Sequence, residues 1–241
     1  MPSFGLPWET WEPVYEAILE DFGFSRADDE AARDRLADLV DSTGLSPEAL
    51  PDATNRTVAI AGGAPSLRDE LAVAQRADLV FGVSTASATL LEESIAVDLH
   101  VTDLDKDESV VRTLNSGGLP IAVHAHGDNR EQLEELIPAL DSTSLFPTTQ
   151  AEPIAGVANP GGFTDGDRAA FLADALGADT LVFPGWDFDD PAITAEKRRK
   201  LAWAARLLAW LEIRRDERFA VLDGRRDDLA LPPGIGSSRE D

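Results

Sequence analysis

The sequence predicts an α/β fold in which helices flank a mostly parallel β-sheet and a helical segment precedes the sheet. From residue 57 onward, short apolar runs alternate with segments of helical length, as in a parallel sheet covered by helices. The runs are almost continuously apolar, which is typical of strands buried on both faces. The first ~50 residues have helical apolar spacing instead. We therefore expect a Rossmann-like sheet with an N-terminal helical segment.

Residues 1–54 form the predicted helical segment. Helical spacing covers residues 9–21 and 27–40, and Ser25 with Asp28 can cap the second helix. A stretch containing proline and asparagine then leads into the α/β domain, predicted at residues 55–215. Residues 216–241 are polar and rich in proline and glycine, so we expect an acidic, weakly ordered tail.

Six apolar runs are the predicted strands, and each is followed by polar or glycine-rich residues. The predicted strands are 58–60, 79–81, 99–101, 121–123, 154–157 and 181–183. The predicted helices are 66–76, 86–94, 107–115, 130–140, 165–176 and 192–215. The strand-end segments are GGAPSL, STAS, TDLD, HAHGDN, NPGGFTDGD and GWDFDD. The carboxyl ends of parallel strands share one edge of the sheet, where ligands bind, so these segments predict one shared site.

Composition narrows the class of protein. The chain has 241 residues, which suits one α/β domain with a small accessory segment, and no cysteine, which excludes disulfides and thiolate metal sites. No apolar run approaches the ~20 residues that a membrane span needs. The N-terminus lacks the basic region and apolar core of a secretory signal. We expect a soluble cytoplasmic protein without a membrane partner.

The net charge of -24 is the strongest compositional signal. A surface this negative repels phosphate backbones, so we expect no nucleic-acid partner. The hydrophobic content of 43% still supports a core, which argues against disorder. Our hypothesis is adaptation to a high-salt cytoplasm, because salt shortens the screening length and reduces repulsion between acids.

The segment GGAPSL joins the first predicted strand to a helix. Gly62 and Gly63 let the backbone approach a ligand, and Ser66 with Asp69 can cap the helix. Free N–H groups at such a helix start suit a phosphate, although an ordinary turn explains the same residues. The segment is neither a P-loop nor a dinucleotide fingerprint, since no Gly-Lys-Ser/Thr occurs in the chain.

Two carboxylates follow the third strand, in TDLD. Asp103 and Asp105 are two residues apart on an extended segment, so their side chains point the same way and can share a hard cation such as Mg²⁺. A solvated turn in a very acidic protein is the alternative. Two like charges at a strand end are costly without a cation, which favours the metal role.

HAHGDN follows the fourth strand and contains two of the three histidines in the chain, His124 and His126. Without cysteine, a zinc site here would need carboxylates to complete its coordination. Asp128 and Asn129 are better suited to Mg²⁺-bound water or to ligand hydroxyls. Hydrogen-bonded packing below the site is the alternative role of the histidines.

FTDGDR opens a predicted helix with Asp165 and Asp167. Acids in a first turn stabilise a helix by capping and by the helix dipole, which is sufficient for either residue. Their position at the ligand edge also favours a functional role, and Arg168 could bind phosphate. On the last helix, Lys200 is a scarce cation, although Glu196 and Lys200 also make an ordinary i,i+4 pair.

The segments TDLD, HAHGDN, TTQ, GGFTDGDRA and GWDF, in this order and spacing, resemble those of the archaeal-type 6-hydroxymethyl-7,8-dihydropterin pyrophosphokinases. The resemblance covers about residues 8–215, and HAHGDN together with GGFTDGDRA is specific. It implies a sheet domain like that of thiamine pyrophosphokinases. It also implies diphosphate transfer from ATP to a pterin hydroxymethyl group, with Mg²⁺ and release of AMP, in folate or methanopterin-type cofactor biosynthesis.

The same resemblance implies roles for individual residues. The implied metal ligands are Asp103, Asp105 and Asp128, with His126 and Asn129 completing the catalytic centre. The implied nucleotide or pterin contacts are Gly62, Gly63, Ser66, Thr148, Thr149, Gln150, Asp165, Asp167, Arg168, Asp187 and Lys200. Two departures stand out, since Ala64 and Lys106 occupy positions where glycine is the family's usual residue. Neither departure removes a carboxylate.

Several alternatives stay open. Diphosphate transfer needs mainly positioning and charge neutralisation, and the base could be Asp128 or another aspartate. A related transferase with thiamine or a sugar as acceptor, or a non-catalytic nucleotide-binding module, would use the same segments. A purely structural acidic protein would leave them unexplained. The N-terminal helices could cover the site or form the surface of a homodimer.

Overall fold

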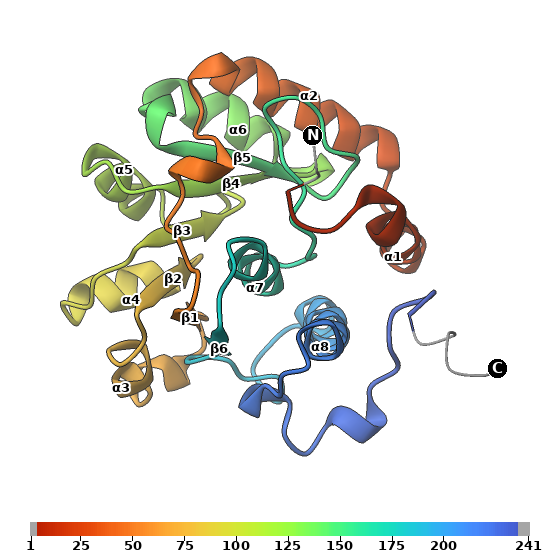
Figure 1. Cartoon of the computed structure of the whole chain (residues 1–241). Coiled ribbons are helices and arrows are strands. Elements are labelled where there is room, and N and C mark those ends of the chain that lie inside the picture. The colour runs from red at the N-terminus through yellow and green to blue at the C-terminus, as the bar shows by residue number, and fades with distance from the viewer. Residues whose placement is uncertain (1–3, 236–241) are drawn as a thin grey trace.

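The computed structural model describes residues 4–235, which form a parallel six-stranded sheet between two layers of helices (Figure 1). The strand order is β5-β4-β3-β2-β1-β6, and every neighbouring pair is parallel. The strands are β1 (Thr57–Ala61), β2 (Leu79–Val83), β3 (Leu99–Thr102), β4 (Ile121–Ala125), β5 (Leu145–Thr149) and β6 (Thr180–Val182). The predicted α/β class with a parallel sheet is confirmed.

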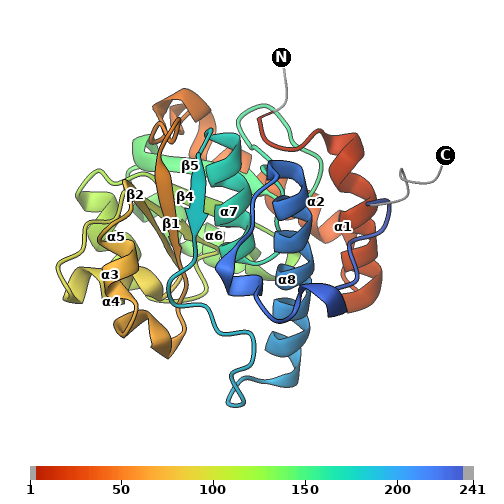
Figure 2. The ribbon, with the colours of Figure 1, turned by 60° about the horizontal axis from the view of Figure 1, so that its bottom comes forward.

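Eight α-helices, joined in places by short 3₁₀ turns, accompany the sheet in the described part of the chain. They are α1 (Trp8–Phe22), α2 (Arg26–Val40), α3 (Leu71–Ala74), α4 (Ala86–Glu92), α5 (Glu108–Ser116), α6 (Arg130–Leu136), α7 (Asp165–Ala175) and α8 (Ala195–Arg215). Helices α2 to α6 cover one face, while α7 packs on β1, β2 and β3 from the other (Figure 1). Figure 2 shows α7 between the sheet and α8, with α1 beside α8. None of the helices within residues 4–235 has the length and apolarity of a membrane span.

The N-terminal helices are part of the core and not a separate unit. Ser25 caps α2 as predicted, because its Oγ accepts the Asp28 N–H at 3.3 Å. The buried stripe of α2, which includes Leu36, packs with α6 against β4 and β5. On the other side, the Trp11 ring of α1 stacks on Trp210 of α8, with 6.5 Å between centroids and 3° between ring planes.

The prediction of the fifth strand is wrong. Residues 154–157, predicted as a strand, form a turn in which Ile154 and Val157 bridge each other. The strand is Leu145–Thr149, and it contains Pro147, which cannot donate a hydrogen bond to a neighbouring strand. Proline is tolerated there because β5 is at the edge of the sheet. The Ala158 segment covers part of that edge, with its N–H donating to the Pro147 carbonyl at 3.0 Å.

Part of the segment expected to be a weakly ordered tail packs on the domain. Phe219 is 1% exposed and Leu222 is fully buried. Arg226 donates to both carboxylate oxygens of Glu212 on α8, at 2.9 and 2.7 Å, and so ties the segment to the helix. Residues 236–241 of the predicted tail lie outside the described residues.

Candidate active site

A pocket of about 550 Å³ lies at the carboxyl ends of the strands. All six strand-end segments that we predicted to form one site contribute residues to it. The turn between α1 and α2 and the first part of α8 complete its walls. This arrangement follows from the topology, because parallel strands direct all their carboxyl ends to one edge.

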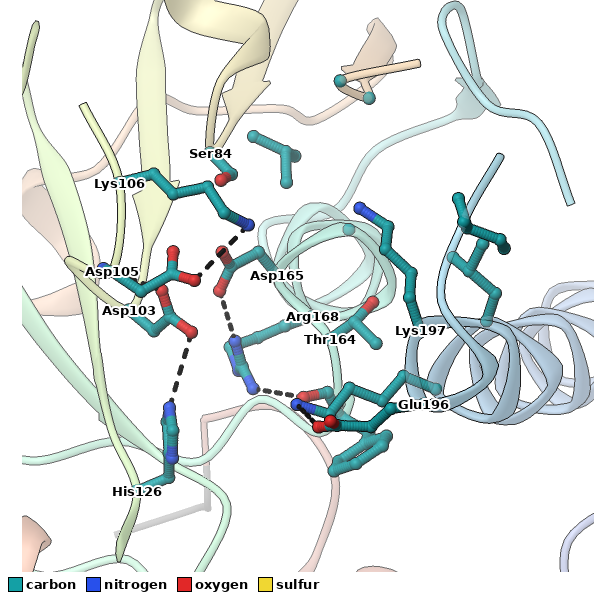
Figure 3. A pocket seen from close by; sticks show the side chains of 18 of the residues that line it. Ser84, Asp103, Asp105, Lys106, His126, Thr164, Asp165, Arg168, Glu196 and Lys197 are labelled. Atoms are coloured by element: carbon teal, nitrogen blue, oxygen red, sulfur yellow. Dashed lines mark hydrogen bonds and ion pairs between the residues drawn. The ribbon is translucent and has the colours of Figure 1, made fainter. Parts of the chain in front are cut away.

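Three carboxylates converge on the pocket from two elements, as Figure 3 shows for Asp103 and Asp105 after β3 and for Asp165 at the start of α7. The segment after β3 turns sharply, with the Asp105 N–H donating to the Asp103 Oδ1 at 3.2 Å. On the other side, the Asp103 Oδ2 lies 3.4 Å from the His126 Nε2. We refer to Asp103, Asp105 and Asp165 as the acidic centre.

The pKa values of the three carboxyl groups of the acidic centre are shifted in different directions. Burial favours a higher pKa for Asp103, but hydrogen bonds from His126 and Asp105 outweigh it and hold that pKa below its ordinary value. Burial raises the pKa of Asp105, and the neighbouring Asp103 raises it further. Burial and then the charge of Asp103 raise the pKa of Asp165 to about 8, although Arg168 opposes the shift. The site therefore holds its negative charge at a cost that a bound cation would remove.

The acidic centre fits a Mg²⁺ ion that is shared with a ligand, and not a complete protein-only metal site. In residues 4–235 no three or more His, Asp or Glu side chains are arranged to hold one ion. Asp128, predicted to join Asp103 and Asp105 as a ligand, lies exposed on the pocket rim. Mg²⁺ commonly takes one or two carboxylates and completes its shell with water and substrate phosphates, and the donor set here suits that mode.

Two residues predicted to take part in the chemistry instead hold the loops in place. Asn129 is 2% exposed, and its amide nitrogen donates to the carbonyls of Asp103 and His124 at 2.7 Å each. It thereby fixes the loop after β3 to the loop after β4. Asp167 is fully buried and caps α7, accepting the N–H groups of Phe163 at 2.6 Å and Thr164 at 3.0 Å. Neither Asn129 nor Asp167 lines the pocket.

Arg168 lies beneath the acidic centre, where it is 2% exposed. Its Nη1 donates to the Asp165 Oδ1 at 2.9 Å, and its Nη2 donates to the Phe163 carbonyl at 2.8 Å (Figure 3). The guanidinium lines the pocket while it compensates one carboxylate of the centre. A phosphate bound by Arg168, as predicted, would compete with the ion pair between Arg168 and Asp165.

Of the predicted trio at 148–150, only Gln150 lines the pocket. Thr148 is buried in β5, where its Oγ1 donates to the Val123 carbonyl at 3.0 Å and lies 3.2 Å from the His124 Nδ1. The Thr149 Oγ1 accepts the Ala151 N–H at 3.1 Å. The two hydroxyl groups therefore order the end of the strand, and do not reach the pocket.

The glycines of the loop after β1 make room for neighbouring groups. A Cβ on Gly62 would lie 2.8 Å from the Trp186 ring, and one on Gly63 would clash with the Thr85 Oγ1. Trp186 is anchored by its Nε1, which donates to the Ile60 carbonyl at 2.9 Å. The predicted cap by Ser66 is wrong, because the helical turn there begins after Ala64 without a side-chain cap.

The far wall of the pocket comes from the loop after β6 and from α8. Asp187 lines it, exposed, with its Oδ1 accepting the Asp189 N–H at 2.8 Å. Lys200 lines it as well, with its Nζ 3.3 Å from the Glu196 Oε1, and so does Lys197 one turn earlier. The structure thus places Asp187 and Lys200 in the same pocket as the acidic centre.

Asp29 on α2 lines the pocket, although no sequence motif predicts a role for it. It is 3% exposed and accepts hydrogen bonds from the Tyr15 hydroxyl at 2.9 Å, the Gln150 Nε2 at 2.8 Å and the Gly127 N–H at 2.8 Å. Burial and the charge of Asp29 raise the pKa of Tyr15. Asp29 therefore joins both N-terminal helices to the loops after β4 and β5, and it also lines the pocket.

Comparison with known proteins shows the family to which the chain belongs. A family model described as 6-hydroxymethylpterin diphosphokinase MptE-like matches residues 36–192. A 6-hydroxymethyl-7,8-dihydropterin pyrophosphokinase from Methanothermobacter thermautotrophicus is 37% identical over 228 residues, covering 88% of this chain and 97% of the relative. Proteins of the same name from Pyrococcus furiosus and Methanocaldococcus jannaschii are 34% and 32% identical, each over 86% of this chain and at least 95% of the relative. The chain therefore belongs to the 6-hydroxymethylpterin diphosphokinase family, as the resemblance of its motifs predicted.

Proposed function

We propose that this enzyme transfers the terminal diphosphate of ATP to the hydroxymethyl group of 6-hydroxymethyl-7,8-dihydropterin and releases AMP. The names of the relatives support the pterin acceptor. The structural observation that carries the proposal is the acidic centre of Asp103, Asp105 and Asp165 at the middle of the strand-end pocket. Such a centre recruits a cation and, through the cation, a polyphosphate that this acidic protein would otherwise repel.

Asp103 and Asp105 are the proposed ligands of Mg²⁺, with Asp165 beside them and Asp128 as a contact through water. The bound ion would neutralise charge on the phosphate oxygens. His126 holds Asp103 through the 3.4 Å contact to its Oδ2, and Arg168 holds Asp165 at 2.9 Å. These neighbours keep the carboxylates in place before the ligand arrives, so little reorganisation is needed when it binds.

In the proposed reaction, the hydroxymethyl oxygen of the pterin forms a bond to the β-phosphorus of ATP. The bond between that phosphorus and the oxygen bridging to the α-phosphorus breaks, and AMP leaves with that oxygen. The hydroxyl proton passes to a carboxylate of the site or to solvent. The main tasks of the protein in such a transfer are alignment of the two substrates and stabilisation of charge, which the pocket is built to supply.

Aromatic side chains line the pocket beside the acidic centre. Trp186 and Phe188 follow β6, at one end of the strand order, with 5.7 Å between their ring centroids. Phe24 lines the pocket from the turn before α2, the helix that packs on β4 and β5. Adenine and the pterin are both planar rings that can stack on such side chains. We propose one ring site on each side, with the polyphosphate between them.

The reaction is tested by measuring AMP and pterin diphosphate at high KCl with Mg²⁺ and ATP, with and without the pterin. The expected result is AMP formed only with the pterin and in step with its diphosphate. Asp103→Asn and Asp105→Asn should each lower turnover at least ~100-fold through lost charge stabilisation, whereas Asp69→Asn, exposed and outside the pocket, should not. A folded, ATP-binding protein that forms AMP with thiamine and not with the pterin would overturn the acceptor. Near-normal turnover of both variants would overturn the site.

A further inference from the structure

Lysine and arginine are distributed differently in this protein, with the lysines at the pocket and nearly all the arginines elsewhere. The chain contains three lysines, Lys106, Lys197 and Lys200, and all three line the pocket. It contains 18 arginines, of which only Arg168 lines the pocket among the described residues. The pocket is formed by 35 residues of a 241-residue chain, so a random placement of the lysines would rarely bring all three there.

The different chemistry of lysine and arginine suggests a reason for this distribution. Many of the arginines outside the pocket make ion pairs with carboxylates, as Arg68 does with Glu92 and Glu93 at 2.6 Å each. A guanidinium suits such fixed, planar pairs. A lysine ammonium is a compact charge on a flexible stem, and it binds phosphate without a fixed orientation. Lysine is therefore the better choice where an anion moves between two partners.

The lysines approach the pocket from two walls. Lys106 follows β3, with its Nζ 3.4 Å from the Asp105 Oδ2. Lys197 belongs to the first turn of α8, and in the described part of the chain no carboxylate lies within 4.0 Å of its ammonium group. Figure 3 shows the two side chains extending toward each other from opposite sides. Two converging positive charges repel each other, and an anion between them would remove that repulsion.

We propose that Lys106 and Lys197 bind the diphosphate part of the nucleotide from opposite sides. This inference rests on the proposed function, and it adds two phosphate-binding residues to the acidic centre. Lys106 lies beside Asp105 and so contacts the diphosphate next to the cation. Lys197 contacts it from the α8 wall. The flexible stems let both ammonium groups stay with the diphosphate while its bond to AMP breaks and its bond to the pterin forms.

The test compares Lys197→Gln with Arg198→Gln, which removes the same charge at the next position of α8. Arg198 is exposed, does not line the pocket, and makes no ion pair within residues 4–235. Binding of inorganic pyrophosphate with Mg²⁺ is measured by calorimetry at constant KCl, beside the KM for ATP. Loss of a charged contact should weaken pyrophosphate binding about 10- to 100-fold in Lys197→Gln and Lys106→Gln. Arg198→Gln should stay within about twofold of the wild type, and Lys197→Arg should recover part of the loss.

The outcomes separate this inference from the proposed reaction. Equal effects of Lys197→Gln and Arg198→Gln, or no pyrophosphate binding by the wild-type enzyme, would overturn the lysine assignment. If the wild type forms no pterin diphosphate but pyrophosphate binding still depends on Lys197, the reaction is wrong and the assignment stands. If turnover is normal in Lys197→Gln with unchanged KM and pyrophosphate binding, the reaction stands and the assignment fails.

Discussion

Replacement of Asp29 by asparagine should destabilise the protein more than the loss of any exposed acid. The Asp29 carboxylate accepts three hydrogen bonds, from Tyr15, Gln150 and Gly127, at 2.8 to 2.9 Å. Asparagine has nearly the same shape, but its amide keeps one acceptor oxygen and turns an NH₂ group toward donors. One or two bonds to a charged acceptor are lost, each worth about 1.5–3 kcal/mol. We therefore expect the free energy of unfolding to fall by about 3 kcal/mol.

The assay is urea unfolding at a fixed, high KCl concentration. Urea is preferred because guanidinium chloride is itself a salt and would change the repulsion among 45 acidic residues during the titration. Asp38→Asn is the matched control, since Asp38 is an exposed residue of the same helix, and it should change stability by less than about 0.5 kcal/mol. A loss below about 1 kcal/mol in Asp29→Asn would show that this carboxylate does not join the N-terminal helices to the sheet.

Three further results are expected. Gly166→Ala would place a Cβ 2.6 Å from the Trp186 ring, so it should lower the free energy of unfolding by about 1–3 kcal/mol. Gly117→Ala is the control, since its Cβ would have no atom closer than 3.4 Å. Equal melting temperatures of the two variants would contradict this. Burial lowers the pKa of His100 to about 4 from 6.5, so the folded state binds fewer protons than the unfolded state between these values. Stability should therefore fall as the pH drops from 6.5 toward 4, less steeply in His100→Gln, and parallel profiles would refute the assignment. Added KCl should stabilise a chain of net charge -24, and full stability without salt would argue against salt adaptation.

The strand pattern could be predicted because burial on both faces leaves an apolar run that is visible in one sequence. Five predicted strands overlap the observed ones. The strand at 145–149 could not be predicted because Pro147 interrupts its apolar run. Proline is tolerated there because β5 is the edge strand of the sheet. That position depends on the order of the whole sheet, which local sequence does not encode.

The position of the pocket at the strand ends could be predicted from the sequence, whereas the direction of individual side chains could not. Asp103 and Asp105 reach the pocket as predicted, but Asn129 and Asp167, in equally suggestive motifs, turn back to bond the backbone. Asp29 is one of two acidic residues in the first turn of α2, where acids are common in any helix. Its partners are 14, 98 and 121 residues away, so nothing near it in the sequence marks it.

The stacking of Trp11 on Trp210 has a consequence for how the chain acquires its structure during synthesis. The apolar side of α1 is synthesised long before α8, the helix that stacks on it. Contacts between such distant segments form slowly, because the entropy of closing a long loop is lost before the contact is gained. A nascent chain thus leaves the ring face of Trp11 that stacks on Trp210 uncovered until α8 has been made. Truncation before α8 would leave that surface open to aggregation.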